Sequence, residues 1–274
     1  MTSPIDGGVV MITGASSGIG LEMARVVAPR CRRLVLVARR EERLTALRDE
    51  LLKLRPDLSV TVRLCDLSDA SQTASLAAEC GDLDVLINNA GVGDLSLFER
   101  ADETRLCAMM ELNMTSLVRL TRAALPGMLA RKRGGILNVS SGFGLSYLPG
   151  FAVYVGTKHF VTGFTESLRA ELRGTGVTVT QVCPGPVATE FEQNIGNFTG
   201  HKAPSLIEIS AARCAKVAIR GLDRKRGMVV PGLAVGLSLL LVQFTPRPVV
   251  RWVVALLGGA LRRAQDQTAG RASA

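Results

Sequence analysis

A glycine-rich turn between an apolar run and a helical pattern is the feature that most restricts the fold of this sequence. Val9–Thr13 is a short apolar run, Gly14, Gly18 and Gly20 follow it, and apolar residues then recur at helical spacing over 21–27. This order predicts a buried strand, a tight turn and a helix. Because glycine has no Cβ and a helix N-terminus offers free N–H groups, such a turn can bind the pyrophosphate of a dinucleotide. A glycine turn without a ligand has the same pattern.

Further apolar runs without polar alternation alternate with helical patterns over the first 190 residues. This alternation predicts one doubly wound parallel sheet with helices on both faces, a Rossmann-like α/β fold. The other predicted strands are Leu34–Ala38, Val60–Leu64, Asp84–Ile87, Gly135–Val139 and Val177–Cys183. The predicted helices after the first are Glu41–Leu54, Thr104–Leu129 and Phe151–Arg173.

The end of the second predicted strand carries two arginines, in the order Ala38-Arg39-Arg40. In dinucleotide-binding folds an acidic residue near this place commonly accepts hydrogen bonds from the NAD ribose. An arginine can instead pair with the 2′-phosphate of NADP. We therefore expect NADP(H), bound by Arg39 with Arg40 as the alternative, although both are also compatible with a solvated surface.

Tyr154 and Lys158 are four residues apart in a predicted helix, so they share one face. A cation this close favours the phenolate and lowers the tyrosine pKa from about 10, which makes Tyr154 a candidate acid and base. The same spacing also occurs on ordinary helix surfaces, so it carries weight only together with other motifs.

Several such motifs occur in the order found in one enzyme family. Thr13–Gly20 looks like T-G-x-x-x-G-x-G, Asn88–Gly91 like N-N-A-G, and Tyr154–Lys158 like Y-x-x-x-K. Asn113 takes the place of a helical asparagine, Ser141 precedes Tyr154 by thirteen residues, and Pro184-Gly185 is followed by Thr189. From about Val9 to Glu190 the chain thus resembles the short-chain dehydrogenase/reductases.

The resemblance implies roles for four side chains. Tyr154 would give a proton to a carbonyl oxygen that Ser141 holds, while the cofactor delivers a hydride to the carbon. Lys158 would bind the nicotinamide ribose and lower the Tyr154 pKa, and Asn113 would anchor a water in the proton relay. Gly156 departs from the family, which commonly has a larger residue there, and costs about 1 kcal/mol of helix stability relative to alanine.

The implied cofactor site combines the glycine turn, the ends of several strands and the loop after the sixth strand, with Asp66 and Leu67 beside the adenine. The cofactor-binding residues are expected to be Gly14, Ser16, Ser17, Gly18, Ile19, Gly20, Arg39, Arg40, Asp66, Leu67, Asn89, Ala90, Gly91, Tyr154, Lys158, Pro184, Gly185, Val187 and Thr189. The cysteines form no C-x-x-C pair, so we expect no metal site.

Two other functions are compatible with parts of the sequence. Gly14–Gly18 also satisfies G-x-S-x-G, the nucleophile elbow of serine hydrolases, but that reading needs a histidine and only His159 and His201 exist. A sensor or scaffold that binds cofactor without turnover is the other alternative. The complete set of four catalytic-type residues argues against it.

The C-terminal region differs in charge and hydrophobicity. Residues 213–274 hold eleven basic and two acidic residues, which accounts for the whole net charge of +9. We place a catalytic domain at 1–227 and an extension at 228–274, where the apolar segments Met228–Phe244 and Val249–Leu261 alternate with arginines. Two interpretations of the extension are equally compatible with the sequence. In one, a pair of helices rests on an anionic membrane surface. In the other, Met228–Val230 is a seventh strand and the rest is a substrate lid or a subunit interface.

The expected partners follow from these features. An apolar lid favours a bulky, lipid-like or long-chain carbonyl or alcohol as substrate, and the tail shows no motif that reads nucleic acid. The six scattered cysteines and the absence of a signal peptide fit a cytoplasmic protein, with peripheral membrane association as an option. The family resemblance implies a homo-oligomer, either a dimer or a tetramer.

Overall fold

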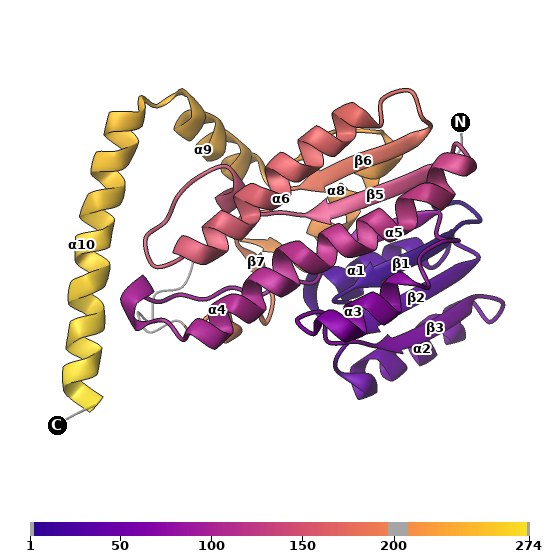
Figure 1. Cartoon of the computed structure of the whole chain (residues 1–274), viewed down its shortest axis with the longest axis horizontal. Helices are drawn as coiled ribbons and strands as arrows, with labels where there is room; N and C mark the ends of the chain where they lie inside the picture. The colour runs from indigo at the N-terminus through magenta and orange to yellow at the C-terminus, as the bar shows by residue number, and fades with distance from the viewer. Residues whose placement is uncertain (1–2, 197–207, 273–274) are drawn as a thin grey trace.

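A parallel sheet of seven strands in the order β3-β2-β1-β4-β5-β6-β9 forms the centre of the protein (Figure 1). The structure is a computed structural model that describes residues 3–196 and 208–272. The strands are β1 (Val9–Thr13), β2 (Arg33–Ala38), β3 (Ser59–Leu64), β4 (Val85–Asn88), β5 (Gly134–Val139), β6 (Val177–Val182) and β9 (Met228–Val229). The predicted strands and the doubly wound fold are confirmed, with ends shifted by at most one residue.

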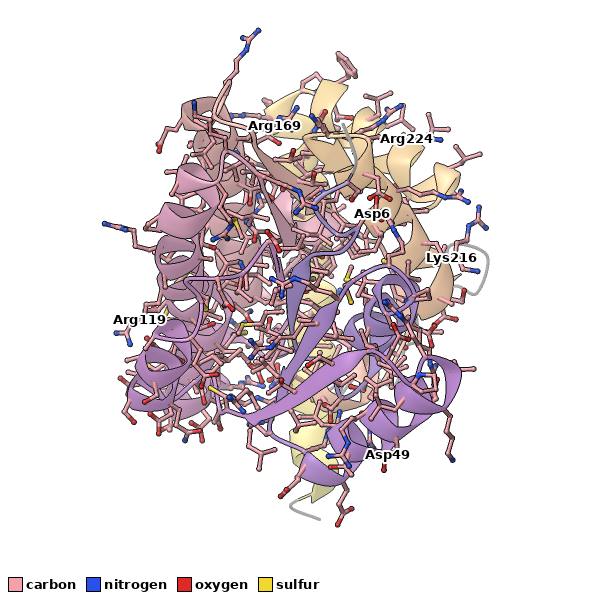
Figure 2. The ribbon with its side chains drawn as sticks, turned by 90° about the vertical axis from the view of Figure 1, so that its right-hand side faces the viewer. Asp6, Asp49, Arg119, Arg169, Lys216 and Arg224 are labelled. Carbon is pink, nitrogen blue, oxygen red and sulfur yellow. The ribbon has the colours of Figure 1, made fainter. Side chains whose placement is uncertain are left out.

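Helices cover both faces of the sheet, because strands such as β1 and β6 are buried along their whole length. One layer holds α1 (Gly18–Val27), α2 (Glu41–Leu54) and α8 (Ala211–Asp223), and the other holds α3 (Ala70–Ala77), α5 (Ser116–Ala130) and α6 (Ala152–Glu171). Figure 2 shows Asp49 of α2 and Lys216 of α8 on one side of the sheet and Arg119 of α5 on the other.

The predicted helix Thr104–Leu129 is not uniform. It consists of α4 (Glu103–Met110), a π-helical turn (Glu111–Thr115) and α5. Such turns are frequent at functional sites. The helices α3 and α8 are absent from the sequence prediction. The buried face of α3 consists of Thr73 and Leu76 alone, which is a weak apolar period. α8 has a clear apolar period, with Ile219 and Leu222 among its buried residues, so the sequence contained the signal for this helix and the prediction missed it.

Short elements follow β6 and frame the open edge of the sheet. They are β7 (Val187–Ala188), α7 (Phe191–Asn194) and β8 (Ile209–Ser210), and β7 pairs with β8 in a separate two-stranded sheet. Two single turns of 3-10 helix, Phe98–Arg100 and Gly142–Gly144, lie in the loops after β4 and β5.

The C-terminal region combines the strand and helices that were considered for it. β9 pairs with β6, so the seventh strand is present, and α9 (Leu233–Phe244) and α10 (Arg247–Ala272) follow it. α10 runs along one edge of the molecule (Figure 1). Among the described residues, neither helix alone is long and apolar enough to cross a bilayer, although the pair, bent by 117°, meets that criterion when taken together. The domain boundary at residue 228 stays a prediction.

Candidate active site

A cavity of about 1300 Å³ lies at the carboxyl ends of the central strands, the place where ligands bind in doubly wound sheets. Its wall contains Ser141, Tyr154 and Lys158 together with all but one of the predicted cofactor-binding residues. The exceptions are Gly20 and the fourth catalytic candidate, Asn113, which lie directly behind the wall. The structure therefore brings the whole predicted site together.

The glycine turn is held from beneath by Asn89. Asn89 Nδ2 donates to the carbonyl oxygens of Thr13 and Gly14 at 2.9 and 3.2 Å, and the Thr13 hydroxyl accepts from the backbone N–H of Asn89 at 3.0 Å. Gly14 has a φ of +67°, which favours glycine. A Cβ on Gly20 would lie 2.3 Å from the Gly14 carbonyl oxygen. Asn89 and Gly20 thus shape the turn and support the surface that faces the cavity.

The arginines after β2 differ in their contacts with this turn. Arg40 donates to Ser16 Oγ at 3.2 Å and to Ser17 Oγ at 2.7 Å. Arg39 has a side chain that is 66% exposed, and its contact with Asp66 is 3.4 Å long. The contacts therefore favour Arg40, the alternative in the sequence prediction, as the cation nearest the turn.

Two further charged residues interact at this end of the site, Glu190 in the cavity wall and Arg43, which pairs with it. Glu190 accepts from Arg40 at 2.9 Å and also pairs with Arg43 of α2, and both arginines hold the pKa of Glu190 below its usual value. Arg43 and Glu190 are absent from the sequence prediction. Arg43 could have been found from its position one turn after Arg39, but the approach of Glu190 depends on the loop after β6.

Tyr154 is buried, with 6% of its surface exposed, and lies among Phe143, Phe151 and Phe191. Burial raises its pKa to about 12, an effect that a hydrogen bond with Ser141 partly offsets. The Ser141 hydroxyl oxygen also accepts from the backbone N–H of Phe143 at 3.1 Å. Ser141 and Tyr154 are thus adjacent, as two groups acting on one carbonyl oxygen must be.

Lys158 does not outweigh the effect of burial on the Tyr154 pKa, so the lowered pKa that the sequence predicted is wrong. Its Nζ donates to the Val139 carbonyl oxygen at 2.9 Å and lies 5.7 Å from the centroid of the Tyr154 ring. Burial also lowers the pKa of Lys158 to about 8, because an apolar environment disfavours the charged form of either group. The helical spacing places the two side chains on one face but does not determine which effect is larger.

Asn113 lies in the π-helical turn and connects two parts of the site. Its Nδ2 donates to the Val92 carbonyl oxygen at 2.9 Å and to Thr157 Oγ1 at 3.1 Å, and its Oδ1 accepts from the Val92 backbone N–H. Thr157 in turn donates to the Tyr154 carbonyl oxygen. The side chain of Asn113 therefore fastens the strand end after β4 to the helix that carries Tyr154. Val92 and Thr157 are missing from the prediction.

The remaining predicted residues frame the cavity. Asp66 accepts from the backbone N–H of Ser68 at 2.9 Å, whereas the side chain of Leu67 is buried in the core. Ala90, Gly91, Ile19 and Val187 form parts of the wall. The Pro184 carbonyl oxygen accepts from Gly142, and Thr189 lies beside Gly18, so the loop after β6 closes over the glycine turn.

The far end of the cavity is apolar. Inward-facing side chains of α9 and α10, among them Val235, Leu239 and Leu261, line it together with Phe143 and Phe151. Gly185 contacts Val235 so closely that a Cβ added to Gly185 would lie 2.5 Å from a methyl carbon of Val235. The C-terminal helices thus cover the cavity as the lid considered in the sequence analysis.

The hydrolase interpretation finds no support among the described residues. Ser16 Oγ accepts from Arg40, and His159 stacks on Tyr147, with ring centroids 5.4 Å apart, and is not part of the cavity wall. His201 lies outside the described residues. No cluster of potential metal ligands occurs within 3–196 and 208–272.

The residues present fit a nicotinamide dinucleotide. The cavity is continuous from the Ser16–Ser17 turn to Tyr154, and Gly14 and Gly18 of the turn form part of its wall. The turn is packed closely against the protein, since a Cβ at Gly14 would meet Ala90 and one at Gly18 would meet Thr189. Arginines stand at one end and a proton-donating hydroxyl at the other. The two ends of such a cofactor need these two environments.

Comparisons with known proteins agree with this geometry. Residues 8–199 match the family model described as short chain dehydrogenase. An NADP-dependent 3-hydroxy acid dehydrogenase, YdfG, of Salmonella typhi is 40% identical over 187 residues, which are 67% of this chain and 74% of that protein.

Two solved structures extend the comparison. A short-chain dehydrogenase from Sphingobium yanoikuyae in complex with NADPH has a TM-score of 0.75 and 29% identity, covering 88% of this chain and 97% of that one. A bulky-bulky ketone specific alcohol dehydrogenase from Comamonas testosteroni has a TM-score of 0.72 and 26% identity, covering 88% and 95%. The chain belongs to the short-chain dehydrogenases and is an NAD(P)-dependent oxidoreductase of carbonyl or alcohol groups.

Proposed function

We propose that this protein is an NADP(H)-dependent reductase of bulky, apolar carbonyl compounds, or a dehydrogenase of the corresponding alcohols. The observation that carries the proposal is one continuous cavity in which Ser141, Tyr154 and Lys158 lie between an arginine-rich end and an apolar end. A homo-oligomer and a cytoplasmic location remain predictions from the sequence.

The preference for NADP(H) rests on the charges after β2. Arg39 and Arg40 line the cavity, Arg43 pairs with Glu190 of the cavity wall, and no acidic residue occupies the strand end. A 2′-phosphate could replace Glu190 as the partner of Arg40, since guanidinium groups pair strongly with phosphate. Solved relatives bind either NADPH or NAD, so these arginines are the basis of the choice.

The catalytic cluster supplies the proton chemistry. When bound, NADPH supplies the hydride. Tyr154, with its raised pKa of about 12, stays protonated at neutral pH and can donate its proton to the carbonyl oxygen. Ser141 can donate a hydrogen bond to the same oxygen because its own oxygen accepts from Phe143. Lys158, held by Val139, would stabilise the phenolate that forms when Tyr154 loses its proton.

The substrate preference rests on the apolar end of the cavity. Leu239 and Val235 are 8% and 6% exposed, and both present apolar side chains to a substrate. The nearby Ser238 hydroxyl already donates a hydrogen bond to the Val235 carbonyl oxygen. Each buried methylene of a substrate contributes about 0.8 kcal/mol, close to a fourfold gain in kcat/KM. The relative from Comamonas testosteroni, named for bulky ketones, supports this preference by analogy.

The test is NADPH oxidation with a series of methyl ketones of increasing chain length. We expect kcat/KM to rise by about fourfold for each methylene until the cavity is full. Leu239→Asn, on the inner side of α9, should flatten this rise. Leu241→Asn, on the exposed side of the same helix with 61% exposure, should leave it unchanged. A series in which rate does not depend on chain length would contradict the proposed substrate class.

A further inference from the structure

We infer that α9 and the first half of α10 form a docking surface for a bilayer that contains anionic lipids. The argument rests on exposed side chains, their helical positions and the local charge. It does not depend on the proposed activity, because the surface lies outside the catalytic cavity.

α9 is apolar on both sides, which is unusual for a helix at the surface of a globular protein. Its inner side, with Val235 and Leu239, packs over the cavity. At about 100° per residue the exposed positions fall within one arc on the opposite side. These residues are Leu233, Leu237, Leu240, Leu241 and Phe244, with exposures of 92, 59, 49, 61 and 81%.

α10 carries a second exposed apolar face after the bend at Thr245-Pro246. Val249, Trp252, Val253 and Leu256 recur at positions i, i+3, i+4 and i+7, which places them on one face, and they are between 44 and 65% exposed. Arg247 and Arg251 lie away from this face by the same helical count. The second half of α10 is attached to the body instead, where Arg262 donates to Glu99 at 2.6 Å and Gln265 accepts from the Leu97 N–H.

We call these nine exposed apolar residues of α9 and α10 the outer face. Exposed apolar residues gathered on two consecutive helices in this way mark an interaction site on a protein surface. The outer face is thus available for a partner, while the inner sides of the same helices line the cavity.

The charge around the outer face selects the partner. From Arg224 to Gln265 the chain contains seven Lys and Arg residues and no Asp or Glu. A second copy of this chain docked by the same face would bring two such cationic segments together. An anionic lipid surface complements them, and apolar residues on one side of a helix with arginines on the other are typical of helices that lie in the membrane interface.

The consequence for the enzyme concerns access to the cavity. Val235 and Leu239 line the cavity from the same helix that carries Leu240 and Leu241 on its outer face. Docking would hold the apolar end of the cavity within one helix diameter, about 10 Å, of the lipid. If the proposed function is correct, a lipid-like carbonyl would enter from the bilayer, but docking itself can be measured without turnover.

The chain carries its own probe, since Trp252 is the only tryptophan and lies on the outer face. The full-length protein would be sedimented with sucrose-loaded vesicles of phosphatidylcholine alone, or of phosphatidylcholine and phosphatidylglycerol in equal parts. We expect sedimentation with the mixed vesicles. Trp252 emission should shift to shorter wavelength and be quenched by brominated acyl chains.

Matched variants separate the apolar and charged contributions. Leu240→Glu should abolish binding, whereas Leu54→Glu, at a 78% exposed leucine at the end of α2, should not change it. Replacing Arg247 and Arg251 by glutamine should weaken vesicle binding about fivefold for each arginine. High salt should also weaken the binding, because it screens the charges. Unchanged NADPH binding by Leu240→Glu would show that this variant is folded.

Three outcomes would overturn the inference. The first is no binding to mixed vesicles together with unchanged Trp252 emission. The second is equal binding to neutral and mixed vesicles, which would remove the role of the arginines. The third is a blue shift of Trp252 that depends on protein concentration and not on lipid, which would assign the outer face to a second copy of the chain.

Discussion

Gly20 offers the most direct test of how the glycine turn is supported. A Cβ at this position would lie 2.3 Å from the Gly14 carbonyl oxygen and 2.4 Å from Asn89 Nδ2, where real Cβ atoms are not found closer than 3.0 Å. Asn89 is itself fastened to Thr13. Gly20→Ala therefore has to displace the turn by several tenths of an ångström, away from the position that faces the cavity.

Overpacking of this kind costs about 1–3 kcal/mol. If the turn has to return to its original position when the cofactor binds, the NADPH dissociation constant should rise by about 5- to 150-fold. The assay is a titration of NADPH fluorescence, with thermal unfolding measured in parallel to show that the variant is folded.

Gly156→Ala is the matched control. Gly156 also lies within a helix, but no atom comes within 4 Å of the Cβ that alanine would add. Here we expect unchanged NADPH affinity and a gain in stability of up to about 1 kcal/mol. A folded Gly20→Ala protein that binds NADPH with the affinity of the parent would refute the reasoning.

Three further predictions concern the charged and polar side chains of the site. Arg40→Ala should weaken NADPH binding about 10- to 100-fold and leave NADH binding nearly unchanged, and equal losses in a binding titration would contradict the assigned role. Lys158→Met should abolish turnover and raise the Tm at pH 7. The pKa of Lys158 is about 8 in the folded protein and 10.5 in the unfolded chain, so between these two pH values the unfolded state binds more protons. The parent therefore gains stability as the pH rises from about 8 to 10.5, and the Tm advantage of the variant should shrink over that range. A pH-independent difference in Tm would be inconsistent with a buried charge. Asn113→Asp should lower stability by about 1–3 kcal/mol and reduce kcat, because the carboxylate cannot donate to Val92, and an unchanged denaturation midpoint would argue against the bridge.

The sequence determines much of this fold because its signals are local. Val9–Thr13 and Val177–Val182 are buried along their length, and continuous apolar runs predict such strands well. The helix α3 is different, since its buried side is formed by Thr73 and Leu76 alone and its start is defined by the Asp69 cap. A weak apolar period of this kind does not separate a short helix from a loop.

The candidate site shows the same limit. Motif order finds Tyr154, Lys158 and Ser141, whereas the pairing of Glu190 with Arg40 joins residues 150 positions apart and follows only from the folded loop after β6. The direction of the Tyr154 pKa shift can also be determined only from the structure. Burial opposes the expected effect of Lys158, and the degree of burial depends on the surrounding phenylalanines.

The central claim, that Tyr154 is the proton donor of an NADPH-dependent carbonyl reductase, is tested most directly by comparing Tyr154→Phe with the parent. Phenylalanine keeps the packing against Phe143, Phe151 and Phe191 and removes only the hydroxyl. We predict NADPH oxidation with a bulky ketone by the parent, a rate lower by about 10²–10⁴-fold in the variant, and unchanged NADPH affinity. Equal rates in both proteins would contradict the assignment of Tyr154. Tight NADPH binding by the parent without turnover of any ketone or aldehyde would favour a cofactor-binding sensor over an enzyme.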